Sequence, residues 1–236
     1  MNLILLSAAD FIESSSRVRL TGRIHAHIME VHRAKKGDVL SVGLIGGKMG
    51  EGRIAAIDKQ SIEMDVVLKE DPPKALPLTL ILALPRPQVI KRVLLCASSL
   101  GIKKIVLLNF FRVEKSLWLS SSLQEGAIRD QLVLGLEQAK DTVMPEVTLK
   151  KSFKKFAEDE LTDLIKGGLP LVAHPGAAQA CPVGVKRPVT LLIGPEGGLI
   201  DYELEKLTQL GFKTVDLGPR ILRVESVLPF ITGKLF

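Results

Sequence analysis

From Leu76 onward, short apolar runs alternate with segments in which apolar residues recur at helical spacing. The first run, 76–84, is nearly unbroken, so the strand that it predicts is buried on both faces. Similar runs follow, separated by helix-period segments, at 104–108, 169–173, 188–193 and 213–217. Buried strands that alternate with helices are typical of an α/β fold with a parallel sheet. We therefore predict an α/β domain over residues 74–236.

Local signals predict where the helices of this domain begin and end. Gly101 follows an apolar stripe at the point where a helix would end. Ser122 and Glu125 have the spacing of a capping box that opens a long helix. A third helix is expected over 153–166, and Asp201 is expected to cap a short fourth helix.

The residues before this domain have a different pattern. Pro72 and Pro73 are adjacent and interrupt any regular element, so we place a domain boundary there. Residues 1–73 contain short β-rich runs separated by glycine turns, which predict a small barrel or sandwich. Such barrels often bind RNA, although this stretch lacks aromatic stacking residues. From these residues alone, a structural or dimerising barrel is equally compatible.

Composition narrows the class of protein. The net charge of +6 comes entirely from residues 74–236 and suggests a polyanionic partner. Cys96 and Cys181 are far apart with no CxxC motif, so we expect no metal site, no disulfide framework and a reducing cytoplasm. The uncharged stretch 167–185 contains several prolines and glycines and predicts no membrane span. Residues 1–10 lack a basic n-region, so they predict a first strand and no signal peptide.

Two glycine-rich loops follow predicted strands directly, at 194–198 and 218–223. Ligands of open α/β sheets bind at the carboxyl ends of strands, so these loops are the candidate site. The first loop lacks the Lys-Ser/Thr of a phosphate-binding loop. Glu196 would also repel a phosphate at ~4 Å by about 4 kcal/mol at an effective dielectric constant of 20. These features disfavour a nucleotide-hydrolysing protein and favour a cation, an ammonium group or ribose hydroxyls as the ligand of the loop. The alternative is that the loop is only a tight turn with no ligand.

Taken together, the loops are more specific than either alone. Leu191-Leu-Ile-Gly-Pro-Glu-Gly-Gly198 and Leu217-Gly-Pro-Arg-Ile-Leu-Arg223, with Glu225, resemble the signature of the RsmE family of SPOUT methyltransferases. Members of that family use S-adenosylmethionine to methylate N3 of a uridine in 16S ribosomal RNA of the small ribosomal subunit. The resemblance implies a PUA-like β-barrel domain over 1–73 and a SPOUT α/β domain with a C-terminal trefoil knot over 74–236. It also implies a cytoplasmic homodimer.

The resemblance assigns roles to individual residues. Arg220 and Arg223 would stabilise charge on the uracil ring, and Glu225 would act as a base or orient an arginine. A purely structural ion pair between Arg223 and Glu225 is the alternative. The residues expected to bind the cofactor are Leu171, His174, Gly194, Glu196, Gly197, Gly198, Leu217, Gly218, Ile221 and Leu222. The residues expected to contact RNA are His25, His27, Arg33 and Arg129. The basic run 150–155 is either a further phosphate contact or a solvated helix face.

Several positions depart from the family pattern. Ser99, Asp141, Val224 and Ser226 stand where the family has other residues. These departures leave the methylated nucleotide less well defined than the cofactor. Two alternatives stay open: a SPOUT methyltransferase that acts on a different RNA, and a non-catalytic RNA-binding factor in ribosome assembly.

Overall fold

The computed structural model describes residues 2–12 and 16–236. The chain forms two compact units. The N-terminal unit consists of Met1–Lys74 and Val133–Met144, and the C-terminal unit consists of Ala75–Leu132 and Pro145–Phe236. No helix among the described residues is long and apolar enough to cross a membrane.

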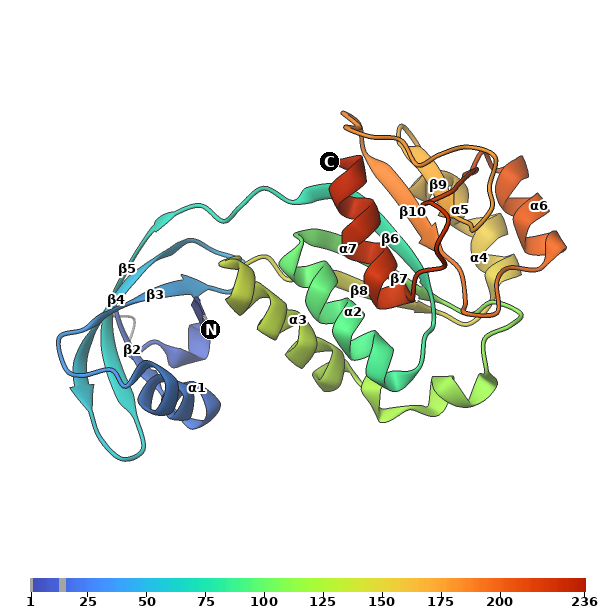
Figure 1. The fold of residues 1–236 in the computed structure, drawn as a ribbon. Coiled ribbons are helices and arrows are strands. Elements are labelled where there is room, and N and C mark those ends of the chain that lie inside the picture. The colour runs from blue at the N-terminus through green and yellow to red at the C-terminus, as the bar shows by residue number, and fades with distance from the viewer. Residues whose placement is uncertain (1, 13–15) are drawn as a thin grey trace. The chain divides into compact units, whose positions relative to one another are not determined.

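The N-terminal unit is built on a five-stranded sheet (Figure 1). Its strand order is β1 (Ile4–Leu6), β3 (Val39–Leu44), β4 (Met49–Ile57), β5 (Ile62–Glu70) and β2 (Arg17–Leu20). β1 pairs with β3 in parallel, and the other ladders are antiparallel. All five strands contribute side chains to one core, among them Ile4, Val18, Val42, Ile54 and Met64. Gly50 is required at a register irregularity in the pairing of β4 with β5, because a Cβ there would clash with the Val67 carbonyl oxygen.

A short helical stretch follows β2 in the same unit. It consists of α1 (Gly22–His27) and a turn of π-helix at Ile28–His32. Arg33 ends this stretch with a left-handed φ of 51°. A 3-10 turn, η1 (Ala8–Asp10), precedes β2.

The second half of helix α3 (Glu125–Ala139) belongs to the N-terminal unit. Leu136 is fully buried there against Leu3. The Glu137 carboxylate, only 2% exposed, lies 2.6 Å from the Arg23 guanidinium. The sequence analysis placed these residues in the second domain, because the apolar stripe of a helix gives its period but does not identify the surface against which it packs.

The C-terminal unit contains the parallel sheet that the apolar runs predicted, which confirms the α/β class. The strand order is β11 (Lys213–Val215), β9 (Leu169–Ala173), β10 (Val189–Ile193), β6 (Leu76–Ala83), β7 (Ile102–Leu108) and β8 (Glu146–Lys150). The sequence analysis missed β8. This strand lies at the sheet edge, and its polar residues lack the continuous apolar character of the central strands.

Helices cover the sheet of the C-terminal unit. Helices α2 (Pro87–Ser99) and α7 (Val224–Leu235) pack side by side (Figure 1). The remaining helices are α4 (Phe153–Asp159), α5 (Leu161–Leu164), α6 (Asp201–Gln209) and the 3-10 turns η3 (Lys115–Leu119) and η4 (Ser121–Leu123). Gly101 follows α2 with a φ of 79°, as predicted for a helix C-terminus. Pro229 lies inside α7 on its exposed side.

Two local predictions in this unit are wrong. The Ser122 hydroxyl contacts the Ser120 hydroxyl at 2.8 Å and lies in a separate 3-10 turn before α3, so it forms no capping box with Glu125. The single helix expected over 153–166 is interrupted at Glu160. The Glu160 carboxylate instead binds the Lys150 ammonium group at 2.7 Å, so Lys150 of the basic run is part of a local ion pair.

Candidate functional site

The candidate site lies where three parallel strands end together. Ala173 at the end of β9 is level with Ile193 of β10 and with Val215 of β11. On its other side, β10 pairs with β6. The chain runs from β6 outward through β7 and β8, and then returns to form β9, β10 and β11 on the opposite side. The boundary between β6 and β10 is therefore a topological switch point, the usual position of a ligand site in an open α/β sheet.

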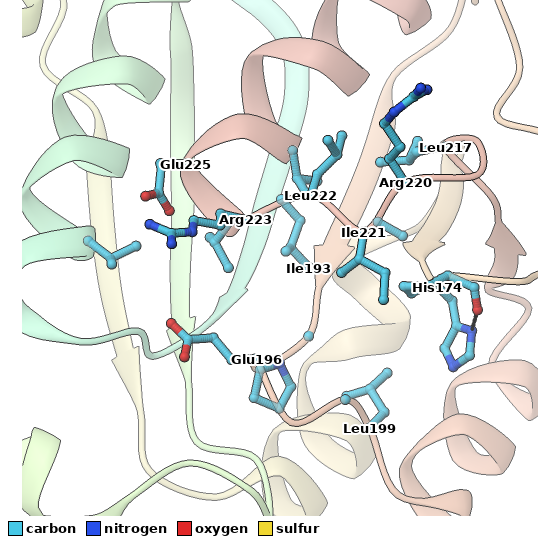
Figure 2. A pocket seen from close by; sticks show the side chains of 18 of the residues that line it. His174, Ile193, Glu196, Leu199, Leu217, Arg220, Ile221, Leu222, Arg223 and Glu225 are labelled. Atoms are coloured by element: carbon cyan, nitrogen blue, oxygen red, sulfur yellow. Dashed lines mark hydrogen bonds between the residues drawn. The ribbon is translucent and has the colours of Figure 1, made fainter.

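A cavity of about 1390 Å³ opens at these strand ends (Figure 2). Most of the residues predicted to bind the cofactor or to act in catalysis line it: His174, Gly194, Glu196, Gly198, Leu217, Gly218, Arg220, Ile221, Leu222, Arg223 and Glu225. Both glycine-rich loops thus border one cavity, although about twenty residues separate them in the sequence.

Two of the predicted cofactor residues do not line this cavity. Leu171 is 1% exposed in the middle of β9, where its backbone pairs with β10 and β11. Gly197 lines a separate, smaller cavity of about 200 Å³ on the β6 side. The family resemblance that assigned these two residues does not show which side of a strand or loop each residue faces.

A buried carboxylate anchors the first glycine-rich loop. Glu203 of α6 is 2% exposed and accepts backbone hydrogen bonds from Phe111 at 2.8 Å and Ile200 at 3.0 Å. It therefore joins the segment after β7 to the end of the first loop. The cap predicted at Asp201 is wrong, because Asp201 is already the first residue of α6. The N-cap residue is Ile200, and its backbone N–H donates to the Glu203 carboxylate. A glutamate at the third helical position is the sequence signal that could have shown this.

The first loop is also held from its exposed side. The Arg112 guanidinium donates a hydrogen bond to the Gly197 carbonyl oxygen. Its side chain lies so close that a Cβ on Gly197 would be 3.2 Å from the Arg112 Cδ. Gly198 has a φ of 77°, a conformation that favours glycine. The sequence analysis did not single out Arg112, which lies some 85 positions away from the loop that it contacts.

The second loop is anchored at its start. The Asp216 carboxylate accepts backbone hydrogen bonds from Gly176 at 3.0 Å and from Gly218 at 2.8 Å. These bonds, with that of Gly218 the strongest influence, hold the pKa of Asp216 below its usual range. Beyond this anchor the loop is open to solvent, and Ile221 is 86% exposed. Arg220 and Arg223 are also exposed.

The second loop ends at the N-terminus of α7. Arg223 is the N-cap residue and extends beside Glu225, whereas Arg220 points away from both (Figure 2). The Glu225 carboxylate lies 3.7 Å from the guanidinium of Arg92 on α2. The structural partner of Glu225 is therefore Arg92, a residue that the sequence analysis did not identify. The first backbone N–H groups of a helix lack intrahelical partners and favour an anion.

The lining of the main cavity is mixed in character. Ala173, Ile193 and Leu199 supply apolar surface, and Glu196 supplies an exposed carboxylate. The ring of His174 contacts the carbonyl oxygen of its neighbour Pro175 at 3.0 Å. Across the described residues, 2–12 and 16–236, no group of three or more His, Cys, Asp or Glu side chains is arranged to hold a metal ion.

The residues predicted to contact RNA have varied surroundings. In the N-terminal unit, His25 is half-buried with Nε2 3.1 Å from the Asp58 carbonyl oxygen, and Arg33 is exposed. The Nε2 atom of His27 is buried without a hydrogen-bond partner in the part of the chain that the structure describes, and burial lowers the pKa of this residue. In the C-terminal unit, Arg129 is exposed on the first half of α3.

Comparison with curated proteins identifies relatives that align over nearly the whole chain. The chain is 28% identical over 231 residues to ribosomal RNA small subunit methyltransferase E of Treponema pallidum (strain Nichols), covering 96% of this chain and 87% of the relative. It is 23% identical over 229 residues to ribosomal RNA small subunit methyltransferase E 1 of Borreliella burgdorferi, covering 96% of this chain and 93% of the relative.

The fold is shared with solved structures. A putative methyltransferase from Legionella pneumophila, solved with bound SAM, aligns with a TM-score of 0.73 at 23% identity, covering 98% of this chain and 94% of that chain. The ribosomal RNA small subunit methyltransferase E from Neisseria gonorrhoeae, solved with S-adenosyl methionine, aligns with a TM-score of 0.71 at 19% identity, covering 98% and 96%.

The family itself is established by sequence. Residues 72–235 match the family described as an RNA methyltransferase domain, and this match spans more than half of the chain. It includes both glycine-rich loops, the arginines of the second loop and the whole of the main cavity. The comparisons thus confirm the resemblance found in the loops, and the chain belongs to the RNA methyltransferase family.

Proposed function

We propose that this RNA methyltransferase uses S-adenosylmethionine to methylate N3 of a uridine in 16S ribosomal RNA of the small ribosomal subunit. The observation that carries the proposal is the main cavity at the switch point, bordered by a glycine-rich loop with a carboxylate and by a second loop with two arginines. The names of the relatives from Treponema and Borreliella support the ribosomal substrate.

The main cavity fits the proposed cofactor. Apolar side chains such as Ala173, Ile193 and Leu199 suit the adenine ring, and the glycines of the first loop let the backbone approach a ligand closely. The Glu196 carboxylate suits ribose hydroxyls or the ammonium group of the methionine part. When bound, S-adenosylmethionine supplies an electrophilic methyl group on a sulfonium ion.

The protein must prepare the acceptor nitrogen. N3 of a uridine carries a proton at neutral pH, so this proton passes to a solvent water molecule and negative charge spreads over the ring oxygens. N3 then forms a bond to the methyl carbon as the bond from that carbon to sulfur breaks, and the electron pair of the broken bond stays on sulfur. Arg223 at the N-cap of α7, with Arg220 on the same loop, supplies positive charge toward the anionic ring.

Glu225 has a different role in this scheme. Its carboxylate pairs with Arg92 at 3.7 Å, and this contact would be lost if Glu225 took up the uridine proton. We therefore assign Glu225 to the orientation of the Arg92 guanidinium group at the acceptor side of the main cavity. Holding both reactants in alignment supplies several kcal/mol toward the transition state.

The architecture implied by the family resemblance is part of the same proposal. The common core shared by five strands supports a PUA-like barrel in the N-terminal unit. The segment after β9 pairs with Asp216 through Gln179 and Cys181, and its Val185 N–H bonds to Leu235 at the end of α7. Pairing of one segment with both ends of the C-terminal stretch supports a threaded, knotted chain. We further propose that the enzyme is a cytoplasmic homodimer.

RNA contacts outside the cavity are proposed at His25, Arg33 and Arg129. Arg33 and Arg129 are exposed cations suited to phosphate contacts, which add affinity without reading sequence. His27 is assigned to packing, because burial lowers its pKa and disfavours its charged form.

The test has two stages. Calorimetric titration of the purified protein with S-adenosylmethionine measures cofactor affinity. Small ribosomal subunits from a strain that lacks this gene are then incubated with protein and cofactor, and modified uridines are mapped by mass spectrometry. Methylation at N3 of one 16S uridine is expected. Methylation only of transfer RNA or large-subunit RNA would indicate a methyltransferase that acts on a different RNA. Cofactor binding with no turnover would indicate a non-catalytic RNA-binding factor in ribosome assembly.

A further inference from the structure

Three segments of the C-terminal unit meet at the sheet edge that also holds the main cavity. They are the segment after β7, the turn between β8 and α4, and the start of α6. The Asn109 N–H donates to the Lys150 carbonyl oxygen at 2.8 Å, which joins the first segment to the second. The Phe111 N–H donates to the Glu203 carboxylate at 2.8 Å, which joins the first segment to the third. Side chains from all three segments therefore share one part of the surface.

An aromatic cluster underlies these segments. Phe110 is 1% exposed, and its ring centroid lies 5.2 Å from that of Phe153, the first residue of α4. Phe153 in turn meets Tyr202 of α6 edge to face, with the ring centroids 6.3 Å apart. Helices α4 and α6 are neighbours in the fold (Figure 1). The cluster therefore fixes the backbone that carries the exposed neighbours of these rings.

Two aromatic side chains of this region face solvent. Phe111 is 76% exposed, more than any other aromatic residue of the chain, and Tyr202 is 47% exposed. A single exposed apolar residue is common in proteins. Phe111 differs because its backbone is tied to the Glu203 carboxylate, which is itself 2% exposed. A ring on a fixed backbone loses little conformational freedom when a ligand stacks on it.

Lysines of the basic run lie beside these rings. Lys151, Lys154 and Lys155 are exposed, and none of them forms an ion pair among the residues that the structure describes. Lys154 and Lys155 belong to the first turn of α4, whereas the carboxylates of this helix, Glu158 and Asp159, belong to its last turn. A polyanion that approaches the start of α4 therefore meets three positive charges.

The region is continuous with the first glycine-rich loop. Arg112 directly follows Phe111 and donates a hydrogen bond to the Gly197 carbonyl oxygen. On the other side, Leu199 lines the main cavity and precedes the start of α6, which carries Tyr202. A chain bound at this region therefore runs beside the main cavity.

We define the aromatic–lysine surface as Phe111, Tyr202, Lys151, Lys154 and Lys155. We propose that this surface binds an unpaired stretch of the RNA substrate next to the methylated uridine, with a base stacked on Phe111 and phosphates at the lysines. This inference rests on the proposed function and adds a binding region outside the main cavity. Proteins that bind single-stranded nucleic acid combine aromatic stacking platforms with positive charge along the backbone. A duplex has no free base face for Phe111, so the surface selects single-stranded RNA.

The first test removes the exposed ring. Fluorescence anisotropy measures the Kd for a labelled single-stranded oligouridylate and for an RNA duplex of the same length. Phe111→Ala should raise the Kd for the oligouridylate at least about fivefold, the low end of the loss expected for one stacked base, and leave the Kd for the duplex unchanged. Phe111→Trp keeps a stacking face and should bind as the wild type does. Val183→Ala truncates a residue that is also 76% exposed and should have no effect.

The second test removes the positive charges. Each phosphate contact to a single strand contributes about 0.7 to the slope of log Kd against log salt concentration, so changing the three lysines of the surface to glutamine should lower this slope by about 2. The control makes the same change in net charge at three exposed lysines near the amino ends of β9, β10 and β11, at the opposite edge of the sheet: Lys166, Lys186 and Lys213. The control should keep the slope of the wild type, and all variants should keep its Kd for S-adenosylmethionine.

Catalysis provides a further readout. On small ribosomal subunits, Phe111→Ala should raise KM with kcat nearly unchanged, because the surface binds substrate without touching the reacting atoms. A fall in kcat at an unchanged KM would contradict a binding role.

Three other results would overturn the inference. An unchanged Kd for the oligouridylate in Phe111→Ala and in the lysine variant would favour a protein partner at this surface. An equal loss for single-stranded and duplex RNA in Phe111→Ala would exclude stacking. Equal losses in the two triple variants would assign the lysines to long-range attraction by net charge. Failure of the proposed function is distinguishable from all of these, because the wild-type protein itself would then bind no cofactor or methylate no RNA.

Discussion

The two glycine-rich loops border one cavity but are held in different ways. The loop 194–198 is fixed from two sides, by the buried carboxylate of Glu203 near its end and by the Arg112 guanidinium at its carbonyl. The loop 218–223 is fixed at its start by Asp216 and, apart from the half-buried Leu222, is exposed up to the N-cap of α7. A segment with few buried contacts opens at lower free energy than one tied to the core.

This difference suggests a division of work between the loops. A methyl donor must be held with one fixed geometry, which suits the doubly anchored loop. An RNA strand must enter and leave in every turnover, which suits an exposed loop whose arginines can rearrange around it. Under the proposed function, the first loop would hold the methyl donor rigidly and the second loop would adjust around the acceptor, and each of the following changes tests one half of that comparison.

The largest effect on stability is expected at Glu203. In Glu203→Ala, two partly buried backbone N–H groups lose their acceptor, at a cost of about 1–3 kcal/mol each. We expect the free energy of unfolding in urea to fall by about 2–6 kcal/mol. Glu203→Gln, which keeps one acceptor oxygen, should lose about half as much. Glu205→Ala, at an exposed position of the same helix, should change stability by less than about 0.5 kcal/mol. Equal stability of the Glu203→Ala and Glu205→Ala variants would show that Glu203 does not anchor the loop.

The largest effect on catalysis is expected at Arg223. Loss of one donor that stabilises a developing anion typically reduces kcat by about 100- to 1,000-fold. Arg223→Ala should show such a loss with an unchanged Kd for S-adenosylmethionine, because the residue lies on the acceptor side. Arg223→Lys should recover part of the rate. Arg220→Ala should have the smaller effect, since Arg220 points away from Glu225 and Arg223 (Figure 2). A weakened cofactor Kd in Arg223→Ala would contradict the division between the loops.

The sequence predicted those features that depend on local pattern. The continuous apolar run that begins at Leu76 is a buried central strand, and both glycine-rich loops follow strands that end at the same level. Eleven of the thirteen residues chosen for cofactor binding and catalysis line the main cavity, because backbone loops at strand ends converge in any parallel sheet.

The features that the sequence analysis missed depend on partners far away in the chain. Arg112 contacts Gly197 of the first loop and Arg92 contacts Glu225 of α7. Each pair lies 85 positions or more apart in the sequence, and no periodic signal marks such contacts. Leu171 was assigned to the cofactor by the family resemblance, but its side chain is 1% exposed in the middle of β9, between β10 and β11. Strand β8 was missed because its edge position removes the apolar signal.

A moderate effect is expected at Arg112. Arg112→Ala removes the hydrogen bond to the Gly197 carbonyl, and because Arg112 is exposed this bond contributes about 1 kcal/mol. The Kd for S-adenosylmethionine should rise about fivefold by calorimetry. Arg112→Lys keeps a donor and should fall between the wild type and Arg112→Ala, while Lys115→Ala, on the neighbouring 3-10 turn, should match the wild type. An unchanged Kd in Arg112→Ala would mean that Glu203 alone holds the first loop.

The smallest effect is expected at Asp216, the anchor of the exposed loop. Its pKa is depressed in the folded protein by hydrogen bonds from Gly218 and Gly176, so its contribution to stability is fully present above the ordinary aspartate value of about 3.9. That contribution is lost as the pH falls through the lower pKa of the folded state. The difference in urea midpoint between the wild type and Asp216→Asn should therefore be constant from pH 7 to 5 and should shrink below about pH 4. Asp159→Asn, which changes an exposed carboxylate at the end of α4, controls for the change in net charge. A difference that stays constant down to pH 3 would show that the second loop does not depend on the Asp216 carboxylate, and the contrast between the loops would then rest on the first loop alone.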